Sequence, residues 1–134
     1  METFILRLIT ALVAGLIIGI SNRENSMIRV FALVCVGAAL ITIVSMEFFK
    51  FLSYPWISDP GRLAAQIVSA LGFIGSGFIW ITDNNKVGGL SAAAGLWITA
   101  ILGILIGIGL QYVTVIVLLL VITVFGLPAE KWKK

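Results

Sequence analysis

The chain has 134 residues, of which 60% are hydrophobic and 11% are charged, and its formal net charge is +3. Because a soluble globular domain has about 25% charged residues, this composition and a mean hydropathy of +1.16 exclude an ordinary soluble domain and indicate a protein of the lipid bilayer. The chain contains no histidine, which excludes His-based metal sites and Ser–His catalytic pairs.

Four polar interruptions divide the chain into apolar runs, and a helix needs about 20 apolar residues to cross a bilayer. We therefore expect a single all-α domain over residues 1–134, an integral membrane helical bundle of five transmembrane helices. The predicted helices cover residues 3–20, 28–49, 60–81, 90–108 and 112–127.

The first apolar run does not have the features of a cleavable signal peptide. It has no basic segment before it and no small-residue cleavage site after it, and it carries Glu2. We expect the first helix to remain as an anchor. Small residues recur in it at a spacing of four, at Ala11, Gly15 and Gly19. This spacing lets two helix backbones approach closely.

The second apolar run has charged residues near both of its ends. Arg29 lies at its start and is interpreted as an orientation anchor or, alternatively, as a functional residue. Glu47 lies near its end with Lys50 one turn later, which predicts an interfacial ion pair or, alternatively, part of an ion path. Cys35 is the only cysteine, and we expect a free, buried thiol.

The third run combines a sharply defined start with polar residues on one face. Asp59 is suited to be the N-cap and Pro60 to be the first helical residue. Arg62, Gln66 and Ser69 follow at spacings of four and three, which places them on one helical face. In lipid such a face is costly, so we expect it to meet another helix, water or a ligand.

Two interpretations of this face stay open. In the first, Asp59 caps the helix and pairs with Arg62, while Gln66 and Ser69 hydrogen-bond neighbouring helices. In the second, Gln66 and Ser69 line a polar cleft that is open to the outside. The glycines that thin the second half of the helix are predicted to serve close packing, and they are Gly72, Gly75 and Gly77.

Residues 90–127 form one apolar stretch of 38 residues. As one straight helix it would reach about 57 Å, nearly twice the hydrocarbon thickness, so we expect a break around residues 107–112. Small residues recur at a spacing of four and form a ridge that serves either packing within the bundle or a homo-oligomeric interface. They are Ser91, Gly95, Thr99, Gly103 and Gly107.

The distribution of lysine and arginine predicts the orientation. With five spans, one side of the membrane would hold Arg23, Arg29, Lys86, Lys131, Lys133 and Lys134, and the other would hold Arg7, Lys50 and Arg62. The first side has more positive residues and is therefore predicted to be cytoplasmic, which places the N-terminus outside and the C-terminus in the cytoplasm. The positive net charge reflects this asymmetry and gives no reason to expect nucleic acid as a partner.

Three motifs carry a family resemblance. Residues 60–77 read P-x-R-x-A-A-Q-I-V-S-x-x-G-F-x-G-x-G, residues 89–97 read G-L-x-x-A-A-x-L-W, and residues 28–38 read x-R-x-x-x-L-V-x-x-G-A. In order and spacing these motifs resemble the MgtC/SapB family of bacterial inner-membrane proteins, over roughly residues 10–125. The resemblance implies a multi-pass protein of the bacterial cytoplasmic membrane with a role in magnesium homeostasis.

The chain also departs from the family pattern. The family's Glu-Arg pair after the first helix appears here as Asn22-Arg23, and its arginine before the fourth helix appears as Gly88. Two polar residues that follow it appear as Ser91 and Ala92, and a Ser-Gly in the third helix appears as Ser69-Ala70. Many relatives carry a soluble C-terminal domain that we do not expect here. Roles that depend on these features are not carried over.

The candidate chemistry is sparse. Mg²⁺ sites use several oxygen ligands, including carboxylates, and the spacing of Glu47, Asp59, Asp83 and Glu24 does not force any pair of them to converge. The ion ligand is therefore unknown, and no cofactor is expected. Gly75-Ser76-Gly77 looks like part of a serine protease, but the chain has no histidine to act as the base, so we do not expect an enzyme.

The leading hypothesis is a regulatory or stress-adaptation membrane protein that acts through helix contacts with itself, as a homo-oligomer, or with a membrane partner. The alternative is a small ion or solute transporter or channel with a polar path along the third helix.

Overall fold

The computed structural model of the protein describes residues 2–22, 27–52, 59, 61–81, 83 and 86–127. Most of these residues are helical, in the order α1 (Glu2–Ser21), α2 (Ile28–Leu52), α3 (Gly61–Ser76), α4 (Leu90–Ile108) and α5 (Gln111–Gly126). Between α3 and α4, strand β1 (Trp80–Ile81) pairs antiparallel with β2 (Val87–Gly88). The helical class is confirmed, and the short hairpin is an addition to it.

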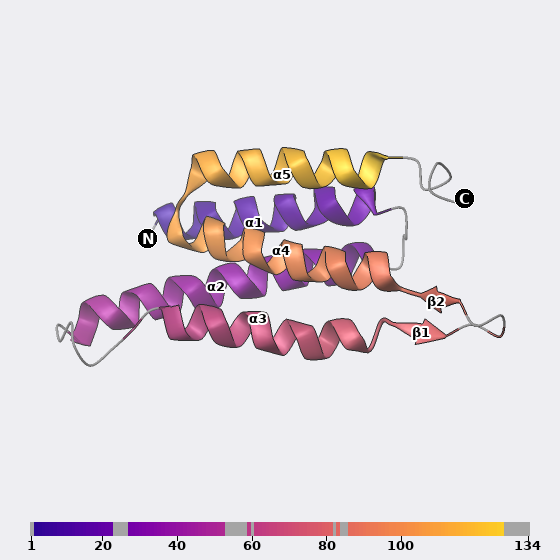
Figure 1. The fold of residues 1–134 in the computed structure, drawn as a ribbon. Helices are drawn as coiled ribbons and strands as arrows, with labels where there is room; N and C mark the ends of the chain where they lie inside the picture. Colours follow the sequence, from indigo (N-terminus) through magenta and orange to yellow (C-terminus); the bar gives the residue numbers. More distant parts are fainter. Residues whose placement is uncertain are drawn as a thin grey trace.

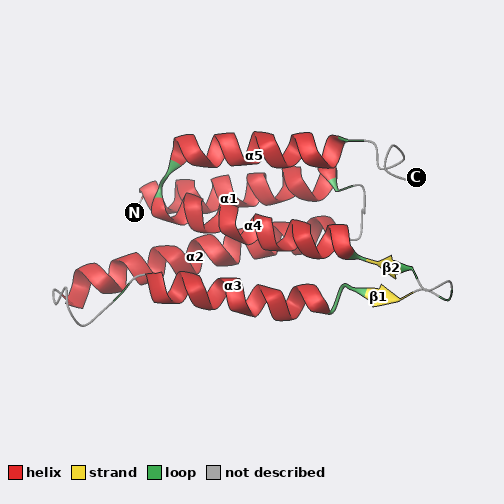
Figure 2. Cartoon of the chain, in the orientation of Figure 1, coloured by secondary structure: helices red, strands yellow, loops and turns green. Residues whose placement is uncertain are grey.

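The helices lie side by side and alternate in direction (Figure 1). The end of α1, the β-hairpin and the end of α5 lie at one end of the bundle, which we call the hairpin end. The start of α1, the end of α2, the start of α3 and the α4–α5 turn lie at the other, which we call the turn end. Figure 2 shows the two strands extending beyond the helices at the hairpin end.

The helices differ in how well their lengths match a bilayer. Among the described residues, Thr3–Ser21 of α1, Ile28–Phe51 of α2 and Leu90–Ile108 of α4 are long and apolar enough to cross a membrane. Helix α5 is apolar but shorter. Helix α3 has 16 residues, about 24 Å at 1.5 Å per residue, which is less than the roughly 30 Å of a hydrocarbon core.

The predicted extent of the third helix, residues 60–81, is therefore wrong at its C-terminal end. The helix stops at Ser76, whose hydroxyl donates to the Phe73 carbonyl at 2.7 Å. The Phe78 and Ile79 N–H groups then bond three residues back, to Gly75 and Ser76, in tight turns. Serine and glycine are poor helix formers, and the apolar residues beyond them pair in the hairpin instead.

The predicted break in the last apolar stretch is confirmed. Helix α4 ends at Ile108 and is capped by Gly109, which adopts the left-handed conformation with φ +94°. The Gly109 N–H reaches the carbonyls of Leu105 and Ile106, and the Leu110 N–H also reaches Leu105. This is the pattern that closes a helix through glycine, and it lets α5 begin at Gln111 and run back along the bundle.

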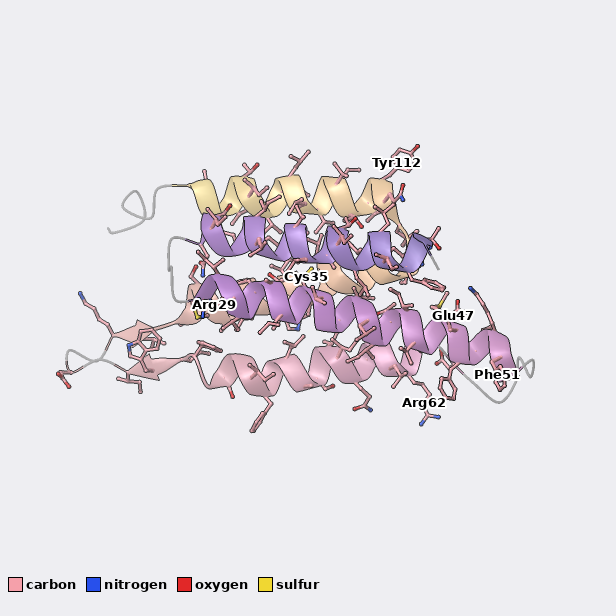
Figure 3. All side chains as sticks on the ribbon, turned by 180° about the vertical axis from the view of Figure 1, so that it is seen from behind. Arg29, Cys35, Glu47, Phe51, Arg62 and Tyr112 are labelled. Carbon is pink, nitrogen blue, oxygen red and sulfur yellow. The ribbon has the colours of Figure 1, made fainter. Side chains whose placement is uncertain are left out.

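The core lies where α2 packs against both α1 and α4, and the α1–α2 and α2–α4 contacts are the most extensive between helices. Helix α3 contacts mainly α4. The largest side chains that are fully buried are Ile18, Phe31, Cys35, Leu96, Thr99 and Leu102. The expected free, buried thiol at Cys35 is confirmed, and Figure 3 shows it between the helices.

The small-residue ridges of α1 and α4 explain how closely these helices approach α2. A Cβ added at Gly15 would lie 2.7 Å from the Cα of Ala32. A Cβ added at Gly107 would lie 2.7 Å from the Thr42 Cβ and 2.8 Å from the Ala39 carbonyl oxygen. Real Cβ atoms do not approach so closely, so both ridges serve packing within the bundle.

Candidate functional site

The start of α3 is organised by Asp59. Its Oδ1 accepts a hydrogen bond from the Gly61 N–H at 2.8 Å, and its carbonyl accepts one from the Arg62 N–H at 3.2 Å. The predicted capping role is confirmed, while Pro60 lies outside the described residues. The expected Asp59–Arg62 ion pair is wrong: among the described residues the ion pair is Glu47–Lys50, and the Asp59 carboxylate is turned to the backbone instead.

Helix α3 packs through an apolar stripe. Its buried residues are Ile67, Leu71 and Gly75, which recur every four residues and therefore share one face. A Cβ at Gly75 would lie 3.8 Å from the Ala93 Cβ of α4, an ordinary van der Waals distance. This contact is looser than those of α4 with α2, so α4 holds α3 less closely than it holds α2.

The polar residues of α3 lie on the opposite side. Arg62, Gln66 and Ser69 are all exposed, and Figure 3 shows Arg62 pointing away from the other helices. With 3.6 residues per turn, their face lies about half a turn from Leu71. We call this side the outer face of α3, and it consists of Arg62, Ala65, Gln66, Ser69, Gly72, Phe73 and Ser76.

The hydrogen bonds of this face stay within α3. The Ser69 hydroxyl donates to the Ala65 carbonyl at 3.2 Å, so it does not bond a neighbouring helix of the same chain as one interpretation expected. Gly72 is exposed, and nothing lies within 4 Å of where its Cβ would be. Gly77 is exposed as well. The close-packing role predicted for these two glycines is thus not realised within the chain.

The other predicted residues are spread over the two ends. Arg29 is exposed near the hairpin end, and Glu47 lies near the turn end of the same helix (Figure 3). The Lys50 Nζ is 2.7 Å from the Glu47 Oε1, which confirms the predicted ion pair. Ser91 is exposed at the start of α4. Arg23 lies outside the described residues.

The predicted glycines of α4 are buried against side chains as well as backbones. A Cβ at Gly95 would lie 2.9 Å from the Phe31 Cε1 and 2.9 Å from the Phe125 Cζ. At Gly103 it would lie 2.9 Å from the Ala38 Cβ.

Among the described residues, no three Asp, Glu, Cys or His side chains come together in a group that could hold a metal ion.

Arg7 was not predicted to be a functional residue from the sequence, where it served only as one of the positive residues on the side of the membrane predicted to be outside. In the structure its Nη1 donates to the Gly107 carbonyl at 2.8 Å, so it links the first and fourth helices. Its position inside an apolar run was the available signal, because a charge there is expected to have a specific partner.

Comparison with known proteins decides the family. A model of the MgtC family matches residues 8–131. The chain belongs to the MgtC family. This confirms the family resemblance, and together with the apolar helices it makes the protein a bacterial membrane protein.

Two relatives illustrate the match. The chain is 39% identical over 130 residues to the "Putative magnesium transporter YhiD" of Escherichia coli (strain K12), an alignment that covers 91% of this chain and 60% of that protein. It is 39% identical over 112 residues to "Protein MgtC" of Salmonella typhimurium (strain LT2), which covers 81% of this chain and 45% of that protein. The chain thus spans about half the length of these relatives. No solved structure matches it.

Proposed function

We propose that this MgtC-family chain is a regulatory, stress-adaptation protein of the bacterial cytoplasmic membrane that acts through the outer face of α3. The observation that carries the proposal is the position of that face, which lies opposite the only stripe through which α3 is buried. The face would contact a second copy of the chain or another membrane protein.

The exposed side of α5 suits lipid much better than this face does. On α5, Leu119, Leu120 and Val124 are 59%, 61% and 65% exposed, and apolar side chains carry no cost in the bilayer. The outer face of α3 instead presents the amide of Gln66 and the hydroxyl of Ser69. Polar groups at membrane depth are expensive unless they find partners, so this face favours protein as its neighbour.

The outer face also has the shape that a helix partner needs. Ala65, Ser69, Gly72 and Ser76 are all exposed and follow one another at spacings of four, three and four. We call them the small-residue stripe. Small residues at such spacings let two backbones approach, and serine and glutamine side chains can then hydrogen-bond across the contact. The α1 and α4 ridges cannot serve in this way, because they are already packed against α2.

A photoreactive residue on the outer face would test the proposal directly. We expect p-benzoylphenylalanine at Gln66, activated in native membranes, to form a protein adduct. The same residue at Leu120, 61% exposed on α5, is the control and should give lipid adducts only. An adduct of twice the chain mass identifies a second copy, and another mass identifies a different partner. Lipid adducts alone at Gln66 would contradict the proposal.

We further propose that all five helices span the membrane, with the bilayer thinned locally around the 16-residue helices α3 and α5, and with the N-terminus outside and the C-terminus in the cytoplasm. The alternating directions in Figure 1 support an odd number of crossings. Arg29 and Lys86 lie at the hairpin end. Helices α1 and α5 also end there, and in the sequence Arg23 follows α1 while Lys131, Lys133 and Lys134 follow α5. Positive residues favour the cytoplasmic side, so the hairpin end would be cytoplasmic.

Cysteine labelling tests this orientation. Tyr112, at the turn end, is 90% exposed, and Ile81, in the hairpin, is 74% exposed. A membrane-impermeant maleimide should label Tyr112→Cys in intact cells and Ile81→Cys only after permeabilisation. The native Cys35 is 0% exposed and should stay unlabelled. The reverse pattern would show the opposite orientation.

One observation favours the alternative of transport, namely the name "Putative magnesium transporter" of one relative. Because Arg62, Gln66 and Ser69 lie on the outside of a single chain, a path along them would need a second copy facing them. Ion flux in proteoliposomes separates the two functions. If flux occurs and Gln66→Leu with Ser69→Ala leaves it unchanged, the path does not follow this face.

A further inference from the structure

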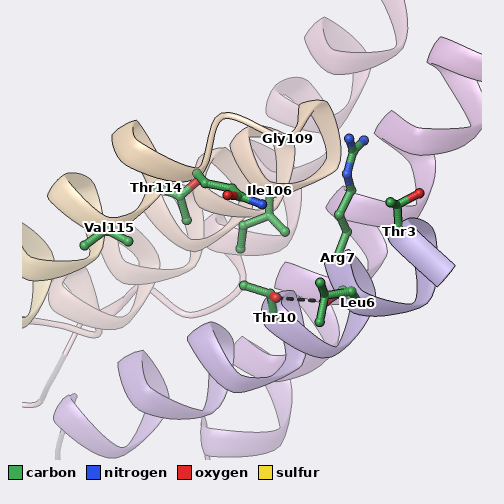
Figure 4. A pocket seen from close by; sticks show the side chains of 9 residues that line it. Thr3, Leu6, Arg7, Thr10, Ile106, Gly109, Thr114 and Val115 are labelled. Carbon is green, nitrogen blue, oxygen red and sulfur yellow. Dashed lines mark hydrogen bonds between the residues drawn. The ribbon is translucent and has the colours of Figure 1, made fainter.

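A pocket at the turn end lies apart from the outer face of α3. It has a volume of about 320 Å³ and is formed where the first turns of α1 face the α4–α5 turn. Figure 4 shows side chains from both sides of it. The lining residues are Thr3, Leu6, Arg7 and Thr10 of α1, Ile106 and Gly109 at the end of α4, and Gln111, Thr114 and Val115 of α5.

Arg7 is fixed in place at the edge of this pocket. Its Nη1 donates to the Gly107 carbonyl at 2.8 Å, in the last turn of α4, where the helix dipole is negative. Gly109 makes room for the guanidinium, because a Cβ there would lie 2.7 Å from the Arg7 Nη2. An arginine has five N–H donors, so most of them remain for a ligand.

The other polar groups of the pocket add to its donor character. The amide of Gln111 and the hydroxyl of Thr3 can each donate. The hydroxyl protons of Thr10 and Thr114 are already directed to the carbonyls of Leu6 and Leu110, at 2.8 and 2.9 Å. The nine described lining residues include no carboxylate. The pocket is therefore positive and rich in donors, which suits an anionic oxygen ligand.

The apolar part of the lining further restricts the class of ligand that fits the pocket. Leu6, Ile106 and Val115 complete the walls, and Leu6 and Val115 are themselves 60% and 55% exposed on the surface of the bundle. A ligand that fits would place a charged group beside Arg7 and carbon atoms against these side chains. Arginine is the residue best suited to phosphate oxygens.

We propose that this pocket binds a phosphate group, presented by the headgroup of an anionic phospholipid at the turn end of the bundle. The chemistry of phosphate recognition would be the same for free phosphate, and only the apolar walls favour the lipid. The site does not depend on the function proposed for α3, since it uses other helices.

Thermal unfolding of the purified full chain in a neutral detergent would test the site. The probes are dioctanoyl phosphatidylglycerol, uncharged dioctanoylglycerol and inorganic phosphate. A ligand that binds only the folded state raises the unfolding temperature. We expect phosphatidylglycerol to bind about ten times more tightly than dioctanoylglycerol. Stabilisation by phosphatidylglycerol alone identifies the lipid, and stabilisation by inorganic phosphate as well supports the phosphate site with a free anion as its source. Equal binding of the two lipids, or binding of neither phosphate compound, overturns the proposal.

Matched variants separate binding from a purely structural role of Arg7 at the end of α4. Val115→Phe fills the pocket and leaves the Arg7–Gly107 bond intact, so binding should weaken about tenfold. Val113→Phe, at a position on α5 that does not line the pocket, should bind like the parent. Arg7→Gln should lose binding, whereas Arg62→Gln, an exposed arginine, should retain it. Unchanged binding in Val115→Phe overturns the proposal even if Arg7→Gln does not fold.

Discussion

Replacing Gly103 with leucine is expected to prevent the bundle from folding. Gly103 is buried where α4 crosses α2, and even a Cβ there would meet the Cys35 carbonyl and lie 2.9 Å from the Ala38 Cβ. Overpacking a core by single methylene groups already costs about 1–3 kcal/mol, and folded proteins are stable by only about 5–15 kcal/mol. We expect no folded Gly103→Leu protein in the membrane, measured as yield and as thermal unfolding in detergent.

The neighbouring structure explains why the contact cannot relax. Helix α2 cannot shift freely, because the same face of it also packs closely against α1, where a Cβ added at Gly15 would lie 2.7 Å from the Ala32 Cα. The same substitution at Gly72, where nothing lies within 4 Å, is the control and should leave the fold intact. A Gly103→Leu protein as stable as the parent would show that α2 and α4 do not pack in this way.

Gly72→Leu is expected to abolish the contact of α3 with its partner while the fold persists. Leucine at this position would interrupt the small-residue stripe and hold the partner helix away. We expect the protein adduct formed from a photoreactive residue at Gln66 to fall at least about tenfold, by the sensitivity of close helix contacts to added bulk. Thermal unfolding of the variant in detergent should match that of the parent.

Gly126→Leu is the matched control for this prediction. Gly126 is the last residue of α5, is exposed, and also has nothing within 4 Å of its Cβ position. The variant should form the Gln66 adduct as the parent does. If Gly72→Leu also keeps the adduct, the partner does not lie against the small-residue stripe.

Much of the fold could be predicted from local signals. The Asp59 cap and the break near Gly109 each rest on a few neighbouring residues, and both are confirmed. The end of α3 could not be predicted in this way. Residues 78–81 are apolar and continue the run, so hydropathy alone does not distinguish a longer helix from a strand that pairs with Val87 across a turn.

The candidate site could be predicted only in part, because spacing along a helix is visible in the sequence and packing between helices is not. The spacing of Arg62, Gln66 and Ser69 places them on one face, but it does not say whether that face points toward the bundle. That depends on Ile67 and Leu71, whose packing against α4 is a tertiary contact. Arg7 and its partner Gly107 are 100 positions apart, so the apolar run around Arg7 indicates that it needs a partner but not which residue supplies it.

The close backbone contacts of α2 determine which parts of the molecule can move. Gly15 brings α1 against the backbone of α2, and Gly107 brings α4 against the Ala39 carbonyl and the Thr42 side chain of α2. Helix α3 instead rests on Ile67, Leu71 and a loose contact at Gly75, and it leads at Gly77 into the hairpin. We therefore expect α3 to tilt against α1, α2 and α4 more readily than these three helices move relative to one another. Such a tilt could bind or release a partner at the outer face of α3 without disturbing the packing of the core.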